Sequence, residues 1–175
     1  MTTQTESTYI KLKRKIWPRL FCWGVNFWPC IRSTGGRVYF ISEDFTRLKV
    51  RLPLNWRTRN RVGTIFGGSM YAATDPFFVI MLMEILGRRY IVWDKAGVIR
   101  YRKPGTQTLY ADFHITSEMR DALQTSADTH GEATVTWPIQ LRNSTGEVYA
   151  EVNKTIYVAT KYFYSEKMKS KEKEK

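Results

Sequence analysis

Residues 60–75 of this 175-residue chain read NRVGTIFGGSMYAATD. They open a long apolar segment, because Asp75 and Glu84 are the only charged residues within residues 62–87. A segment of this length could cross a bilayer, which takes about 20 mainly apolar residues. The chain also carries many alternating strands that need an apolar partner, so we predict instead a buried central helix from Gly67 to Leu86.

The rest of the chain predicts an antiparallel sheet. Residues 47–52 read RLKVRL, the period-two pattern of a strand with one face in a core and the other in water. Comparable strand patterns bring the total to about six, at residues 38–42, 47–52, 90–102, 109–115, 133–141 and 148–158. With one long helix between the strand groups, the pattern favours an α+β fold in which the sheet wraps round that helix.

The segments outside the sheet predict short helices around a single domain. Residues 10–31 are rich in Trp and Phe, and we expect one or two short helices there, interrupted at Pro18 and Pro29. A surface helix is expected at residues 117–128. The predicted domain spans residues 1–165, with an N-terminal helical segment at 1–35, a core at 36–160 and a charged flexible tail at 166–175.

The composition narrows the class of protein. Lys and Arg number 28 against 16 Asp and Glu, a formal net charge of +12, while 43% of residues are hydrophobic. The two cysteines, Cys22 and Cys30, have no spacing typical of a metal or redox site, so we expect neither a disulfide framework nor a metal centre. The polar N-terminus fits a signal peptide poorly, which predicts a cytoplasmic protein.

The residues of the opening stretch suit acyl transfer. Free backbone N–H groups at a helix start, here at Gly67 and Gly68, can hold the negative charge that develops on a carbonyl oxygen. Asp75 could act as a general base on water or attack the carbonyl itself, and Asn60 could orient water or substrate. The alternative is that Asp75 only caps a helix beginning at Pro76.

The spacing of these groups separates them within one chain. Asp75 follows Gly67 by eight positions, which is about 12 Å along a continuous helix and too far to flank one carbonyl. Two antiparallel helices related by a twofold axis would bring Asp75 of one copy to Gly67, Gly68 and Asn60 of the other. We therefore predict a homodimer with two equivalent sites.

The stretch resembles the hotdog-fold acyl-CoA thioesterases of the phenylacetate-degradation type, especially a poorly characterised branch described as a domain of unknown function. The similarity rests on the Asn, the Gly-Gly pair and the acidic residue at this spacing. It continues in the sequences DP at 75–76, YIVWDK at 90–95, RKPG at 102–105 and KTIYV at 154–158, and covers residues 10–160. The resemblance implies a dimeric thioester hydrolase that needs no cofactor beyond the coenzyme A moiety of its substrate.

Two groups of residues are candidates for holding such a substrate. Phosphates of coenzyme A could meet Arg100, Arg102 and Lys103 after the central helix, or the arginines that flank Asn60. An acyl chain could contact Phe66, Met70 and Tyr71. The open alternatives are a solvated strand face for the charges and ordinary core packing for the apolar side chains.

The positive charge also allows a second class of function. A basic, Trp-rich N-terminal segment is also typical of a non-catalytic acyl-CoA or lipid binder on anionic membrane surfaces. Nucleic-acid binding rests on charge alone, since no recognition motif accompanies it, and we do not expect it. The sequence leaves open the acyl group, the carrier of the thioester, and whether dimers pair into tetramers.

Overall fold

The computed structural model describes residues 16–173. Its strands are β1 (Arg37–Ile41), β2 (Arg47–Leu52), β3 (Tyr90–Tyr101), β4 (Leu109–His114), β5 (Glu132–Arg142) and β6 (Val148–Thr160). Its helices are α2 (Pro29–Thr34), α3 (Gly67–Ala72), α4 (Phe77–Leu86), α5 (Ser117–His130) and α6 (Lys161–Lys173), and residues 16–25 are also helical. All six predicted strands are confirmed, with ends that shift by one or two residues.

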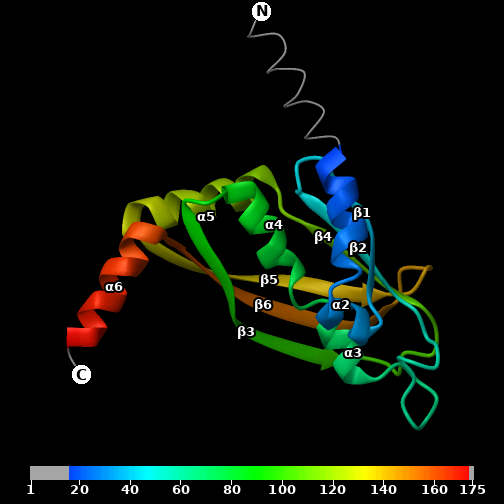
Figure 1. Cartoon of the computed structure of the whole chain (residues 1–175). Coiled ribbons are helices and arrows are strands. Elements are labelled where there is room, and N and C mark those ends of the chain that lie inside the picture. The colour runs from blue at the N-terminus through cyan, green and yellow to red at the C-terminus, as the bar shows by residue number, and fades with distance from the viewer. Residues whose placement is uncertain (1–15, 174–175) are drawn as a thin grey trace, which may run out of the picture.

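The six strands form one antiparallel sheet in the order β1-β2-β4-β5-β6-β3. Figure 1 shows the sheet bending round α4, with β1, β2 and β4 on one side and β5, β6 and β3 on the other. The bend falls between β4 and β5, which pair only at Tyr110 and Arg142. The predicted α+β hotdog fold is therefore confirmed.

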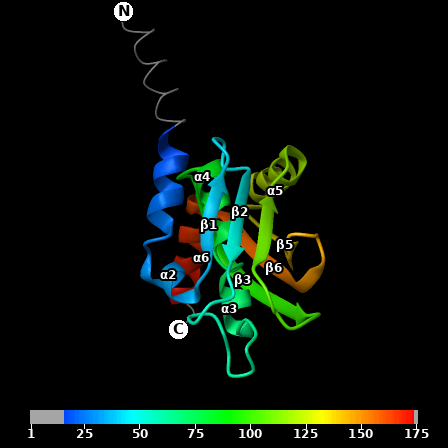
Figure 2. The same cartoon turned by 90° about the vertical axis from the view of Figure 1, so that its right-hand side faces the viewer.

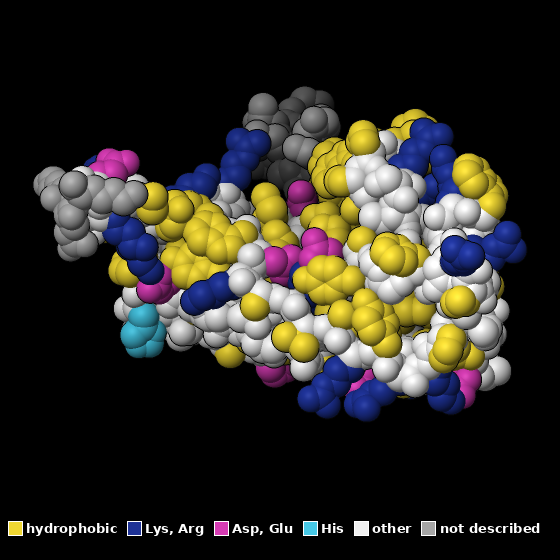
Figure 3. Space-filling view, turned by 90° about the horizontal axis from the view of Figure 1, so that it is seen from below, with side chains coloured by type: hydrophobic (Ala, Val, Ile, Leu, Met, Phe, Trp, Pro, Cys, Tyr) yellow, Lys and Arg dark blue, Asp and Glu magenta, His cyan; other side chains and the backbone are white. Residues whose placement is uncertain are grey.

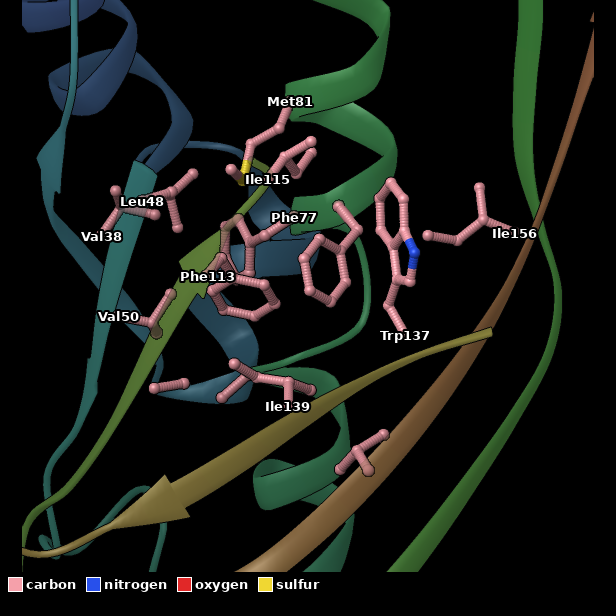
Figure 4. Close-up of a cluster of buried hydrophobic side chains, with 14 of the residues drawn as sticks. Val38, Leu48, Val50, Phe77, Met81, Phe113, Ile115, Trp137, Ile139 and Ile156 are labelled. Carbon is pink, nitrogen blue, oxygen red and sulfur yellow. The ribbon is translucent and has the colours of Figure 1, made fainter. Parts of the chain in front are cut away.

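The core fills the space between α4 and the concave face of the sheet. Alternate residues of β2 are fully buried, among them Leu48 and Val50, as the period-two pattern requires. Figure 4 shows Phe77 and Met81 of α4 lying between side chains of β2 and β4 and those of β5 and β6. The ring of Phe77 packs edge-on to that of Phe113, with centroids 5.5 Å apart.

The predicted continuous helix over residues 67–86 is wrong in one respect, since it is broken at residues 73–76. Pro76 has no N–H to donate to the Ala72 carbonyl, and the Asp75 N–H lies 3.4 Å from that oxygen instead. Gly67–Leu86 is the one described segment with the length and hydropathy of a membrane span. Here its second half, α4, is the buried core helix of the fold.

The N-terminal segment lies along the outer edge of β1 (Figure 2). Pro18 lies in the first turn of the described helix at residues 16–25, and the part of the prediction that concerns residues 10–15 lies outside the described residues. The predicted interruption at Pro29 is present, because Pro29 begins α2, where a missing N–H costs nothing. The Asn26 side-chain amide donates to the Val38 carbonyl and accepts from the Val38 N–H, both at 2.8 Å. Asn26 thus takes the place of a neighbouring strand at this point of β1.

The charged C-terminal stretch, expected as a tail from residue 166, continues α6 as far as Lys173. The first part of this helix contacts the sheet, where Lys167 pairs with Glu132 of β5 at 2.5 Å. Residues 1–15 of the predicted N-terminal segment and residues 174–175 of the predicted tail lie outside the described residues.

Candidate active site

A buried lysine holds two carboxylates beside the broken helix. Lys154 of β6 is 0% exposed, and its Nζ lies 2.6 Å from Asp75 Oδ1 and 3.0 Å from Asp94 Oδ2. The same Nζ lies 5.2 Å from the centre of the Tyr71 ring. Since a buried charge is tolerated only when it is paired, the two aspartates explain how a lysine can occupy the core.

Three elements bring these groups together. Lys154 has the inward register of β6, in line with the buried Val152 and Ile156. Asp94 lies on β3 directly before a bulge that separates it from Ala96, and Asp75 lies in the break between α3 and α4. The bulge therefore positions Asp94 and the helix break positions Asp75. Bulges are common next to functional sites, where they redirect a side chain.

A glycine allows Tyr71 to close over the lysine. Gly97 of β3 is paired with Lys154 of β6, and a Cβ built on Gly97 would lie 2.1 Å from the Tyr71 hydroxyl. Any larger residue at position 97 would push the ring away. This is the close approach that a glycine in a strand permits.

The electrostatics of the three charged groups are coupled. Burial by itself acts to lower the pKa of Lys154, but the hydrogen bonds and charges of Asp75 and Asp94 outweigh it and raise that pKa above its ordinary value. Burial also raises the pKa of Asp94, against the opposing effect of Lys154. Asp94 Oδ1 is buried without a hydrogen-bond partner among the described residues. The site therefore holds more carboxylate than one lysine neutralises.

Asp75 is not a helix cap in this structure. The N-cap of α4 is Pro76, and no side chain caps that helix. The Asp75 side chain is 47% exposed, and Lys154 is the one hydrogen-bond partner of its carboxylate among residues 16–173. One oxygen is thus anchored from the core, and the rest of the carboxylate faces outward.

The Gly-Gly pair lies at a different place, at the start of α3. Phe66 is the N-cap residue and offers no side-chain hydrogen bond, so the first N–H groups of α3 have no side-chain acceptor. Gly67 lines a cavity of about 330 Å³ together with Ile65, Met70, Tyr101, Arg102, Lys103, Pro104 and Gly105. The structure therefore brings Gly67 and Met70 together with two of the predicted phosphate-binding residues.

The remaining predicted residues have varied surroundings. Arg102 donates to Glu151 at 2.9 Å and Lys103 pairs with Glu147, whereas Arg100 is exposed. Phe66 is 57% exposed beside Gly68. Their predicted contacts with a substrate stay predictions.

Asn60 organises its own loop. Its Oδ1 accepts from the N–H groups of Val62 and Thr64, and its Nδ2 donates to the Thr64 hydroxyl at 2.9 Å. The side chain is half-buried and most of its hydrogen-bonding capacity is used within the loop that precedes α3. A role in orienting substrate also stays a prediction.

The sequence analysis did not single out Lys154 as a site residue. Asp94 is its second ion-pair partner, while Lys95 is the exposed residue of the bulge. A signal for Lys154 was present, because the period-two pattern of β6 places it between Val152 and Ile156 on the core face. Among the described residues no His, Cys, Asp and Glu side chains cluster as metal ligands.

The two edges of the sheet differ in how they are covered. The N-terminal helix lies along β1, where Asn26 bonds Val38. At the opposite edge β3 has no further strand beside it, and its residues from Lys95 to Tyr101 are exposed except for Ile99. Such an edge presents a row of free N–H and C=O groups to which another chain can add. Asp94 and Gly97 of the site belong to this strand.

Comparisons with known proteins agree on the fold. Residues 18–158 match the family described as "Domain of unknown function (DUF4442)". No curated protein matches the sequence.

Several solved structures are similar over most of the chain. A protein of unknown function from Pseudomonas aeruginosa, described as a probable thioesterase, has a TM-score of 0.66 at 20% identity and covers 74% of this chain and 86% of its own. A protein of unknown function from Chlorobaculum tepidum has a TM-score of 0.66 at 16% identity, over 84% and 94% of the two chains. A thioesterase from Haemophilus influenzae has a TM-score of 0.59 at 13% identity, over 78% and 87%. At these identities the similarity shows a shared fold.

Proposed function

Because this chain belongs to the DUF4442 family and has the fold of structures that include thioesterases, we propose that it hydrolyses acyl-CoA or a related acyl thioester. The observation that carries the proposal is the Asp75 carboxylate. Buried Lys154 anchors one of its oxygens, while the side chain stays 47% exposed near the uncovered edge of the sheet. A fixed and accessible carboxylate suits the attack of water on a carbonyl carbon.

The proposed reaction adds water to the carbonyl carbon and breaks the carbon–sulfur bond. Asp75 either accepts the proton of the attacking water or attacks the carbonyl itself, after which water hydrolyses the anhydride. The N–H groups of Gly67 and Gly68 would stabilise the oxyanion, and the proton would leave with the thiol. Lys154 is too buried to touch the substrate, so we assign it a positioning role.

The proposed site is shared by two copies. Gly67 lines its own cavity, whereas Asp75 belongs to the ion-paired cluster around Lys154. Antiparallel pairing of two β3 strands would extend the sheet across a twofold axis, and it would use the one uncovered sheet edge among the described residues. Asp75 of one copy would then meet Gly67 and Gly68 of the other.

The coenzyme A moiety would lie at the rim of the cavity beside Gly67. Arg102 and Lys103 line this cavity, and Arg100 is exposed on β3, two residues before Arg102. Phosphate groups would compete with Glu151 and Glu147 for Arg102 and Lys103. An acyl chain would contact Met70, which lines the same cavity and is buried.

Release of free thiol from a panel of aliphatic and aromatic acyl-CoA thioesters tests the proposal. We expect turnover on at least one member, and a loss of about 100-fold or more in kcat for Asp75→Asn, the usual effect of removing a general base. Asp121→Asn, an exposed aspartate of α5, is the matched control and should keep full activity. If the whole panel gives no turnover, the hydrolase assignment is wrong, and tight binding without turnover would favour a non-catalytic acyl-CoA binder.

A further inference from the structure

An exposed aromatic and basic surface lies apart from the proposed site. Trp23 and Phe27 stack with ring centroids 4.5 Å apart, and Trp23 is 68% exposed. Trp56, in the loop after β2, is 80% exposed, and the Arg57 guanidinium lies 5.1 Å from the centre of its ring. We call the set of Trp23, Phe27, Trp28, Arg32, Trp56 and Arg57 the aromatic-basic face.

Two segments distant in sequence make up this face. A groove of about 680 Å³ is lined by Phe27, Pro29, Arg32, Ser33, Trp56 and Arg57, so α2 and the loop after β2 form one surface. Figure 2 shows the N-terminal helix and α2 on the outer side of β1, and Figure 3 shows hydrophobic side chains interspersed with Lys and Arg on the lower face of the molecule.

The arginines in and beside this face have no carboxylate partner in the described part of the chain. Residues 16–42 and 45–74 contain nine Lys and Arg and no Asp or Glu, and of the nine Arg47 and Lys49 pair with Asp112 of β4. Burial lowers the pKa of Arg37, and the positive charges of Arg57, Arg32 and Arg51 lower it further. Among residues 16–173 none of the four lies within ion-pairing distance of a carboxylate. An anionic partner would neutralise this positive charge.

We propose that the aromatic-basic face docks the protein on membranes that contain anionic lipids. Trp and Phe side chains favour the interfacial layer of a bilayer, and each arginine near an anionic surface adds to the electrostatic attraction. Leu20, in the same N-terminal helix as Trp23, is an exposed aliphatic side chain. Such a side chain fits a bilayer better than nucleic acid, whose bases stack on aromatic rings. Docking through this face is independent of the proposed hydrolase activity, because none of its residues belongs to the site.

Flotation of the full chain with phosphatidylcholine vesicles, with and without an equal part of phosphatidylserine, tests the proposal. We expect flotation only with phosphatidylserine, weakened by salt, together with a blue shift of the tryptophan emission. Trp56→Ala with Arg57→Ala should weaken vesicle binding by about tenfold or more. Lys161→Ala with Tyr162→Ala removes a basic and aromatic pair from α6, in which Tyr162 is 79% exposed, and should change binding less than threefold.

Three outcomes would overturn the proposal. The first is no flotation with phosphatidylserine vesicles, and the second is an equal loss in the two double variants. The third is binding to a single-stranded oligonucleotide that is tighter than vesicle binding and is lost in the Trp56 and Arg57 variant, which would assign the face to nucleic acid. A thermal unfolding curve unchanged from that of the wild type confirms that each variant is folded.

Discussion

Lys154 stabilises the candidate site by pairing with its two aspartates. Replacing it by Met would leave Asp75 and Asp94 facing each other without a counter-charge, and breaking a buried ion pair on one side costs about 3 kcal/mol. Urea unfolding should show this loss for Lys154→Met, whereas Lys169→Met, at an exposed pair on α6, should cost less than about 0.5 kcal/mol.

A rescue separates charge from shape in this experiment. The triple variant Asp75→Asn, Asp94→Asn and Lys154→Met should recover most of the unfolding free energy that Lys154→Met alone loses, because all three charges are then removed together. Equal effects of Lys154→Met and Lys169→Met on the free energy of unfolding would contradict the role given to the buried lysine.

The same lysine predicts a dependence on alkaline pH. Its two carboxylates raise its pKa in the folded state, so its contribution to stability is complete below the unfolded pKa of about 10.4 and is lost as the pH rises beyond that value. The difference in unfolding free energy between wild type and Lys154→Met should be constant from neutral pH to about 10 and then shrink. A difference that already shrinks near pH 8 would mean that the lysine is not held by its carboxylates.

The sequence predicted part of this residue-scale arrangement. Asp75 was singled out as an acidic residue in an apolar segment, and Gly67 and Gly68 were singled out for the free N–H groups of a helix start. Lys154 lies 79 positions away from Asp75 in sequence. The pairing of β6 with β3 brings it to Asp94, and the packing of the helix break against the sheet brings it to Asp75. Such long-range partners do not follow from local spacing, although the inward register of Lys154 could have signalled a buried charge.

At the scale of elements, the strands were predictable, whereas the sequence left open whether the helix breaks at Pro76. One buried face per strand leaves a period-two pattern in the sequence, as in β2. Residues 67–86 are apolar enough for one long helix, and a proline inside such a segment can either kink the helix or end it. The structure ends α3 at Ala72 and begins α4 at Phe77, which places Asp75 in a turn rather than on a helix face.

The uncovered strand β3 leads to a prediction about assembly. If two copies pair along β3, Val98→Asp on its exposed part would place two carboxylates on the same pair of strands and should convert a dimer to a monomer. Val62→Asp makes the same change on the exposed loop before α3 and should leave the dimer intact. Sedimentation velocity measures both, and a dimeric Val98→Asp would exclude β3 as the interface.

At the scale of the whole molecule, opposite edges of the sheet have different proposed partners. The β1 edge is covered by the N-terminal helix, which contributes to the aromatic-basic face, and the β3 edge is open to a second copy. A dimer formed through β3 would therefore keep both aromatic-basic faces free for a membrane. Composition alone could not separate these roles, since the net charge of +12 is a property of the entire chain.

The shared site is the central claim, and mixing two inactive variants tests it most directly. Asp75→Asn and Gly68→Val each disable both sites of their own homodimer, but a heterodimer would contain one site built from an intact Asp75 and an intact Gly68. Random exchange of subunits should then restore about one quarter of the wild-type thioesterase activity. If each chain carries a complete site of its own, every site in the mixture lacks one group, and a mixture that stays inactive while its subunits exchange would contradict the account.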